Sequence, residues 1–200
     1  MKRIITIIAL GLVAAMMSAQ TPKNVRYVFT EASDLNLIGK IIEGTPNPYH
    51  RVDTVKYKGF TKSENRQVRC PNGLAVLFKT NSTTISVKCE YGWKAVPMTS
   101  TMVTIRGFDL YIKDGKEWKY AAAGVNKEEK ENENLVLIRN MDGKEKECML
   151  YLPIYSELHS LQIGVQEGTY LHALESPFRP RTGIFDSRFT HGASTTRSGV

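Results

Sequence analysis

The stretch that decides the fold is residues 107–120, which read GFDLYIKDGKEWKY. Apolar Phe108 and Leu110 alternate with Asp109 and Tyr111, and a period of two is typical of a β-strand with two unlike faces. The dipeptide Asp114-Gly115 follows, and both residue types tolerate the positive φ of a tight two-residue turn. The stretch therefore predicts a β-hairpin.

The same pattern continues towards the N-terminus. Apolar residues alternate with polar ones over 85–91, and a second apolar strand precedes it at 74–78. The polar segment KTNSTT, residues 79–84, separates them. We expect these two strands to form a hairpin as well.

Towards the C-terminus, residues 135–153 (LVLIRNMDGKEKECMLYLP) repeat the arrangement around Asp142-Gly143, and 158–165 (LHSLQIGV) form another strand. No segment between 20 and 175 has a convincing helical period. Eight to ten short strands at this spacing predict an all-β fold, an antiparallel β-sandwich of the jelly-roll type.

Composition excludes several classes of protein. Apolar residues make up 42% and charged residues 24%, as in ordinary globular domains. The formal charge of +7 is scattered, and the arginines of 179–197 have no aromatic stacking platform, so nucleic acid is not an expected partner. The run NKEEKENEN, residues 126–134, is expected to be an exposed loop.

The first nineteen residues have the pattern of a secretory signal peptide. MKR is followed by an apolar run of fourteen residues, IITIIALGLVAAMM, and cleavage is expected after Ala19. A retained membrane anchor is the alternative. We expect an exported protein, periplasmic or extracellular, with no membrane contact after cleavage, because no later segment has spanning length.

Three cysteines, an odd number, leave at least one unpaired or paired between chains. The sequence is compatible with two alternatives, a Cys70–Cys89 disulfide or reduced cysteines in the core. The four histidines have no ligand-like spacing, so neither a metal nor an organic cofactor is expected.

The character of the chain changes at Ser176. The segment SPFRPRTG has two prolines and a glycine, which stop helices and central strands. We expect a sandwich domain over 20–175, a linker over 176–182, and a truncated start of a second domain over 183–200, too short to bury a core of its own.

Three motifs together resemble one family, over about residues 25–200. GFDLY at 107–111 resembles the G-x-D-L-Y signature of the β-sandwich at the N-terminus of secreted SGNH (GDSL-type) hydrolases. Residues 149–165 resemble the strand pair that closes that sandwich, and FTHGASTTRSG at 189–199 resembles the first block of the hydrolase domain.

The resemblance implies an exported serine esterase with an α/β hydrolase domain after the sandwich, acting on acyl or acetyl esters, often of carbohydrates. The family nucleophile lies four residues before the glycine of "THG", and that slot holds Arg188, with Ser187 one position earlier. Either Ser187 is the nucleophile in a rearranged turn or the site is degenerate, because arginine cannot form an acyl-enzyme. The Asp-x-x-His that supplies the family's acid and base is absent, so this chain alone is expected to be inactive. His191 could line an ester site, although a polar turn residue is the simpler reading.

Asp109 and Tyr111 are the candidate structural or interface residues. A carboxylate in an apolar strand needs hydrogen bonds or a cation if it is buried, so Asp109 either holds a buried network or contacts the hydrolase domain or a sugar. Trp93, Trp118, Tyr111 and Tyr120 could stack on a sugar ring or fill the core. The alternative function is therefore a stand-alone, non-catalytic carbohydrate-binding or interaction module.

Overall fold

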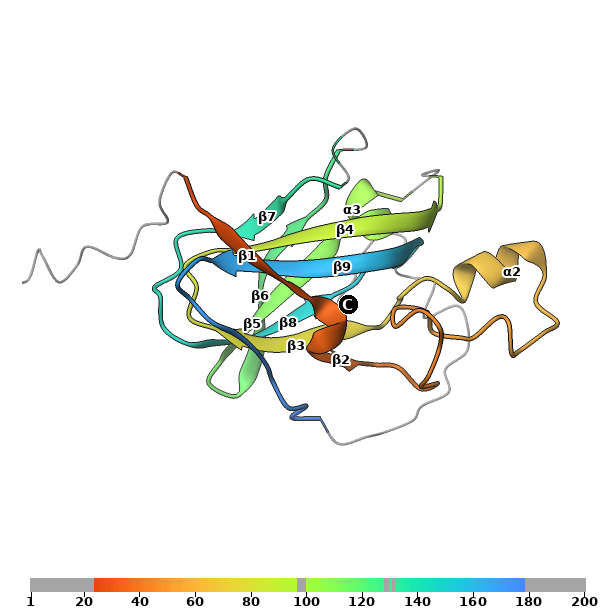
Figure 1. The fold of residues 1–200 in the computed structure, drawn as a ribbon, viewed down its shortest axis with the longest axis horizontal. Helices are drawn as coiled ribbons and strands as arrows, with labels where there is room; N and C mark the ends of the chain where they lie inside the picture. The colour runs from red at the N-terminus through yellow and green to blue at the C-terminus, as the bar shows by residue number, and fades with distance from the viewer. Residues whose placement is uncertain (1–23, 97–99, 128–129, 131, 179–200) are drawn as a thin grey trace, which may run out of the picture.

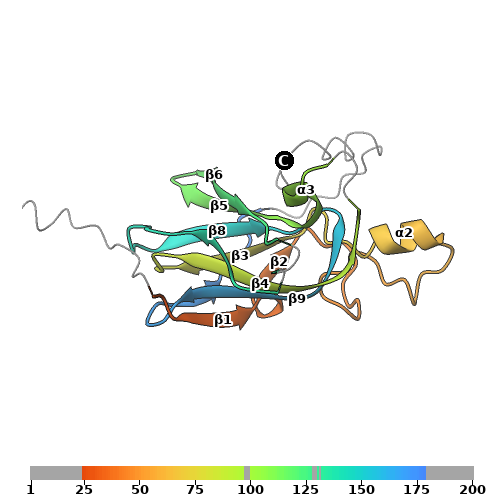
Figure 2. The ribbon, with the colours of Figure 1, turned by 90° about the horizontal axis from the view of Figure 1, so that it is seen from above.

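Two antiparallel β-sheets pack face to face in the computed structural model. The strands of one sheet are nearly aligned with those of the other (Figures 1 and 2). The structure describes residues 24–96, 100–127, 130 and 132–178. The predicted class, an all-β antiparallel sandwich, is confirmed. The jelly-roll connectivity stays a prediction.

Sheet 1 has four strands in the described residues, in the order β1-β9-β4-β7. The long strands β4 and β9 form its centre, with β1 and β7 at the edges. The bounds are Tyr27–Glu31 for β1, Ile85–Lys94 for β4, Leu135–Ile138 for β7 and Ser156–Gln166 for β9.

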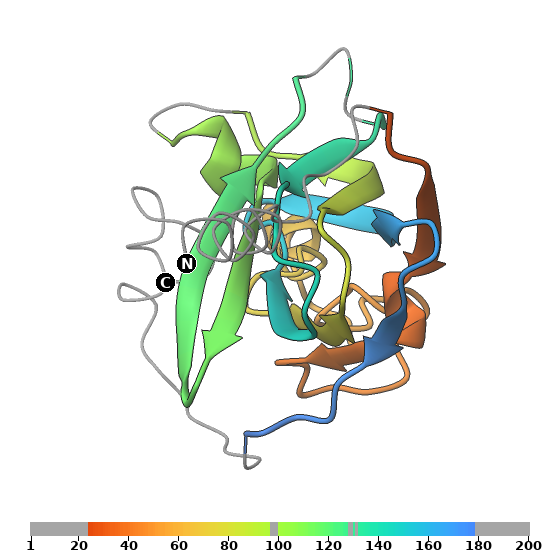
Figure 3. The ribbon, with the colours of Figure 1, turned by 90° about the vertical axis from the view of Figure 1, so that its left-hand side faces the viewer.

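Sheet 2 runs β3-β8-β5-β6, and two short strands, β2 and β10, pair with the remaining edge of β3. They occupy that edge end to end, because β2 pairs with 75–77 and β10 with 78–80. Figure 3 shows the β5–β6 hairpin (green) on the opposite side of the molecule from β1 (red). The bounds are Asn36–Ile38 for β2, Ala75–Thr80 for β3, Phe108–Asp114 for β5, Glu117–Gly124 for β6, Lys146–Tyr151 for β8 and Leu171–Ala173 for β10.

Two of the predicted hairpins are wrong, because the connections pass between the sheets. β3 lies in sheet 2 and β4 in sheet 1, so 79–84 is a crossing turn; β7 and β8 are separated in the same way around Asp142-Gly143. The buried hydroxyl of Ser82 forms hydrogen bonds with backbone groups at this turn. It donates to Thr84 O (2.6 Å) and accepts from Gln166 N (3.0 Å). The turn signals were correct, but sequence alternation does not say which strand is the partner.

The hairpin predicted from residues 107–120 is confirmed, with its turn one residue further on. Asp114 pairs with Glu117, so the turn residues are Gly115 and Lys116, and Gly115 has φ +61°. The positive φ thus falls on the glycine alone, which adopts it without steric cost.

Short helices interrupt the strands, where none was expected. They are the 3₁₀ turn Ala32–Asp34, α2 (Lys62–Gln67) and α3 (Met102–Arg106). Thr61 begins α2 with a capping box: its side chain accepts from Glu64 N while the Glu64 side chain accepts from Thr61 N. Five or six residues are too few to show a helical period. Within the described ranges, no helix is long and apolar enough to cross a bilayer.

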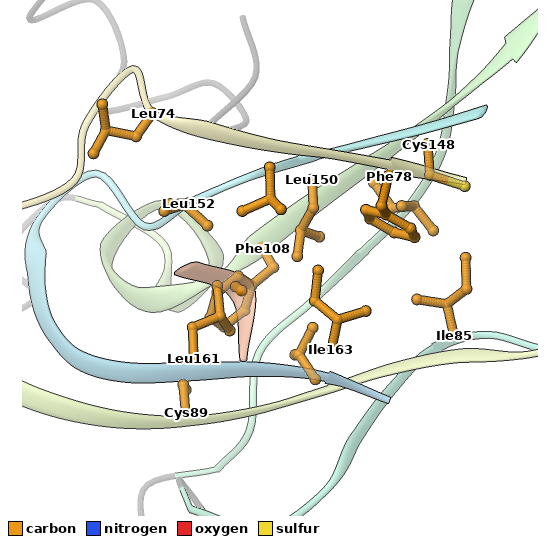
Figure 4. Close-up of a cluster of buried hydrophobic side chains, with 14 of the residues drawn as sticks. Leu74, Phe78, Ile85, Cys89, Phe108, Cys148, Leu150, Leu152, Leu161 and Ile163 are labelled. Atoms are coloured by element: carbon orange, nitrogen blue, oxygen red, sulfur yellow. The ribbon is translucent and has the colours of Figure 1, made fainter. Parts of the chain in front are cut away.

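Figure 4 shows the core between the sheets, where Phe78 and Leu150 of sheet 2 point towards Ile163 of sheet 1. All three cysteines lie in the described chain as buried thiols, which favours the reduced alternative over a Cys70–Cys89 disulfide. Burial raises the pKa of the Cys70 and Cys148 thiols to about 12. These thiols therefore act as small apolar groups and not as nucleophiles.

Candidate functional site

Asp109 and Tyr111 lie on β5 with their side chains directed away from the main core. Their neighbours Phe108 and Leu110 belong to that core, and successive strand residues face opposite sides. Asp109 is nevertheless fully buried, where it pairs in register with Ala123 on β6 and Tyr151 on β8. A carboxylate buried in this way needs hydrogen bonds or a cation. Whether Asp109 holds an internal network or contacts another domain stays a prediction.

Four aromatic residues gather on the outer face of sheet 2, and we call them the aromatic patch: Tyr111, Trp118, Tyr120 and Tyr151. The Tyr111 ring makes edge contacts with Tyr120 (5.8 Å between centroids) and Tyr151 (5.7 Å). Burial, and then the nearby Tyr111, raise the pKa of the Tyr151 hydroxyl.

A small second apolar cluster lies under the aromatic patch. Ala75, Leu77 and Met149 are buried there, on the face of sheet 2 opposite the main core. An outer sheet face with a buried apolar centre is unusual for a sandwich, whose outward residues are ordinarily polar. Partly buried side chains of the same chain, among them Tyr111, Trp118, Tyr151 and Leu174, pack against this centre.

The chain leaving β10 runs over the same outer face. Leu174 N donates to Leu77 O (3.3 Å), and Asn36 Nδ2 donates to Leu174 O (2.8 Å). Four residues later the Phe178 ring lies 6.4 Å from that of Trp118. The described chain thus ends beside the aromatic patch.

The predicted reaction residues lie outside the described part of the chain. Ser187, Arg188 and His191 fall there, as do the end of the predicted linker and the predicted signal peptide. Of the predicted site residues, the described part of the chain therefore contains only Asp109 and Tyr111, which share one face of β5.

A buried cluster of charged side chains lies at one end of the sandwich and was not predicted from the sequence. Glu157, 4% exposed at the start of β9, accepts from Trp93 N (3.1 Å). Its Oε1 lies 2.8 Å from His50 Nε2, 3.3 Å from an Arg69 guanidinium nitrogen and 3.9 Å from His159 Nε2. His50 and Arg69 belong to the long connection between β2 and β3, so Glu157 anchors that connection to sheet 1.

The surroundings of Glu157 fix its geometry. A Cβ on Gly92 would come 2.5 Å from His159 Nε2 and 2.7 Å from Glu157 Oε2, so any larger residue there would have to displace one of these side chains. Burial lowers the pKa of His50, although Glu157 opposes the shift. In the described residues, no group of three or more His, Cys, Asp or Glu side chains is arranged to hold a metal ion.

The signal that singled out Asp109 would also have found Glu157, a charged residue in a strand between Ser156 and Leu158. It would not have found the cluster, because His50, Arg69 and Trp93 come from more than sixty residues away, and spacing along the sequence does not reveal such contacts.

The chain belongs to the family described as "GxDLY: N-terminus of Esterase SGNH hydro-type", whose model matches residues 25–171. No curated protein matches the chain.

A solved structure shows the same fold. A protein from Bacteroides ovatus ATCC 8483, provisionally assigned as a GDSL-like lipase, superposes with a TM-score of 0.72 at 36% identity, covering 77% of this chain and 45% of that one. The salicylyl-acyltransferase SsfX3 of a tetracycline biosynthetic pathway gives a TM-score of 0.47 at 18% identity, covering 78% and 43%. The chain thus spans less than half the length of each of these structures.

Proposed function

We propose that this chain supplies the N-terminal β-sandwich of an exported SGNH-type serine esterase, periplasmic or extracellular, that cleaves acyl or acetyl esters, including those of carbohydrates. The sandwich is the base against which the hydrolase domain docks. The family match over 25–171 carries the proposal. The relative from Bacteroides ovatus, assigned as a GDSL-like lipase, supports the reaction class.

The outer face of sheet 2 is the docking face in this proposal. It has a buried apolar centre at Ala75, Leu77 and Met149 with tyrosines around it. The described chain ends on the same face at Phe178, so a following domain would be tethered beside it. A short tether raises the local concentration of the domain at that face.

In the reaction, the proposed nucleophile is Ser187. A serine hydroxyl needs a histidine to accept its proton, and the tetrahedral oxyanion needs fixed donors. Arg188 beside it cannot form an ester with the acyl group. The histidine, its aspartate and the remaining oxyanion donors would come from sequence beyond Val200, because no Asp-x-x-His occurs in these residues.

The test begins by reading the coding sequence past codon 200 and expressing the full product. We expect that product to hydrolyse a small acetyl ester and Ser187→Ala to lose at least a hundredfold in kcat/KM, on the order of the loss of a catalytic nucleophile. Ser63→Ala, an exposed serine on α2, is the matched control and should keep full activity.

Three results would contradict parts of this account. Full activity in Ser187→Ala removes that serine from the mechanism. Hydrolysis by the 200-residue chain itself contradicts an incomplete catalytic apparatus. A soluble product that binds a glycan and has no esterase activity favours the alternative, a carbohydrate-binding or interaction module that uses the aromatic patch.

A further inference from the structure

A lobe projects from one end of the sandwich, beyond the ends of β4 and β9 (Figures 1 and 2). We define the lobe as residues 51–67, which end with α2. Ten consecutive residues at its tip, 55–64, are all exposed, and α2 buries no side chain. The lobe therefore adds nothing to the hydrophobic core.

The lobe is nonetheless well anchored. Arg51 Nε donates to Cys70 O (2.9 Å), and a second guanidinium nitrogen donates to Gln67 O (3.0 Å), so the two ends of the lobe are joined. Glu157 holds the flanking His50 and Arg69. Asp53 Oδ1 accepts from the backbone N–H groups of Val55 and Lys56, which fixes the turn leading into the tip.

The tip presents apolar and basic side chains in alternation. Val55 is 71% exposed, Tyr57 42% and Phe60 37%, three large apolar side chains within six residues. The lysines between and after them are Lys56, Lys58 and Lys62. No ion pair in the described part of the chain involves these lysines, and the one acidic residue of the tip, Glu64, is engaged in the capping box.

We propose that this tip is a peripheral membrane contact that docks the domain on an anionic phospholipid surface. The three lysines bind the headgroup phosphates, while Val55, Tyr57 and Phe60 enter the boundary between headgroups and acyl chains. At this depth tyrosine keeps its hydroxyl in water while its ring is buried, and phenylalanine contributes an apolar ring alone.

The shape of the lobe favours a bilayer over a protein partner. A stable protein interface needs about 800 Å² on each side with good complementarity. A projecting tip of ten residues offers a convex point instead, which suits a deformable surface. The expectation from the sequence of no membrane contact rested on the lack of a spanning segment, and a peripheral contact needs none.

The test is co-sedimentation with vesicles, using the chain from Gln20 so that the apolar leader does not bind lipid. The whole described core lies within 24–178, so this chain retains the fold. We expect binding to vesicles of phosphatidylcholine with phosphatidylglycerol, little binding to phosphatidylcholine alone, and weakening as salt increases. Replacing Lys56, Lys58 and Lys62 together by Gln should reduce the affinity about a hundredfold, or about fivefold for each lysine.

A matched variant with Lys116, Lys127 and Lys144 replaced by Gln has the same net charge and should bind as the parent does. The variant Val55→Ser with Phe60→Ser should keep the salt dependence but lose affinity, because only the apolar contact is removed. Equal losses in both lysine variants would mean binding through net charge alone and would overturn the proposal. So would the absence of phosphatidylglycerol-dependent binding, including the case in which the tip contacts a protein or a polysaccharide.

Discussion

Asp109 is the single residue that links the sequence motif to the structure. It stands in an apolar strand, on the face away from the main core, and it has no exposed surface. A buried carboxylate is tolerated only where the folded protein supplies hydrogen bonds or a cation in place of water. The two interpretations, an internal network or a contact with a following domain, give different outcomes on substitution.

We predict that Asp109→Asn lowers the free energy of unfolding of the 200-residue chain by about 1–3 kcal/mol, because an amide cannot accept all the bonds of a carboxylate. Urea denaturation measures the loss. Asp114→Asn, at the exposed end of the same strand, is the control and should change little. Unchanged stability in Asp109→Asn, combined with lost esterase activity of the longer product, would support the interdomain interpretation instead.

His50 makes the stability of the lobe anchor depend on pH. Burial lowers the pKa of His50, so the folded chain binds this proton less tightly than the unfolded chain does. Stability is therefore fully present above the ordinary histidine pKa and declines as the pH falls through it towards the lowered value. The groups facing His50 are Glu157, Arg69 and His159.

We predict that the Tm falls between about pH 7.5 and pH 5.5 and that His50→Gln makes this fall smaller. Thermal denaturation followed by circular dichroism measures both. His172→Gln, on the exposed side of β10, should leave the pH dependence as it is. The same pH dependence in His50→Gln as in the parent would remove His50 from this role.

At the scale of elements, local signals were informative where both partners lie in one segment. Residues 107–120 contain both strands and the turn of a hairpin, so the alternation and the glycine could be interpreted together. The partners of β3 and β4 could not be predicted in this way, because contacts at the turn between them, such as that of the Ser82 side chain with the Gln166 backbone, join residues more than eighty positions apart. The short helices escaped because one turn of helix leaves no period.

In the candidate site, too, the sequence predicted only the contacts between residues of one segment. Alternation placed Asp109 and Tyr111 on one face of β5, which the structure confirms as a face opposite the core. Tyr111, Trp118 and Tyr120 of the aromatic patch were candidates from the sequence, but Tyr151 could not be joined to them, because it comes from β8, a neighbour set by sheet order. Glu157 and its partners could not be joined either, since three separate segments supply them.

The anchor between the lobe and sheet 1 depends on the missing side chain at Gly92. We predict that Gly92→Ala displaces His159 or Glu157, whose atoms lie within 2.7 Å of the added Cβ, and so loosens residues 51–67. Limited proteolysis should then cut the lobe faster, while the circular dichroism of the sandwich is kept. Glu90→Ala, exposed on the same strand, should show the parent rate. Equal rates in the two variants would mean that the cluster does not hold the lobe.

At the scale of the whole molecule, the two ends of the sandwich and its two faces differ in character. The core between the sheets accounts for the stability of the domain, and the outer face of sheet 2 bears a second, smaller apolar cluster. The described chain finishes on that face. In the proposed function the sandwich is a base with one docking face, and the lobe lies apart from that face at one end of the molecule.

The most direct test is hydroxyl-radical footprinting of two tyrosines that are equally exposed in the sandwich. Tyr120, in the aromatic patch, is 43% exposed, and Tyr57, on the lobe, is 42% exposed. In the product read past codon 200, the account predicts that oxidation of Tyr120 falls several-fold relative to the 200-residue chain, while oxidation of Tyr57 stays the same. Equal oxidation of Tyr120 in the two proteins would contradict docking on the outer face of sheet 2.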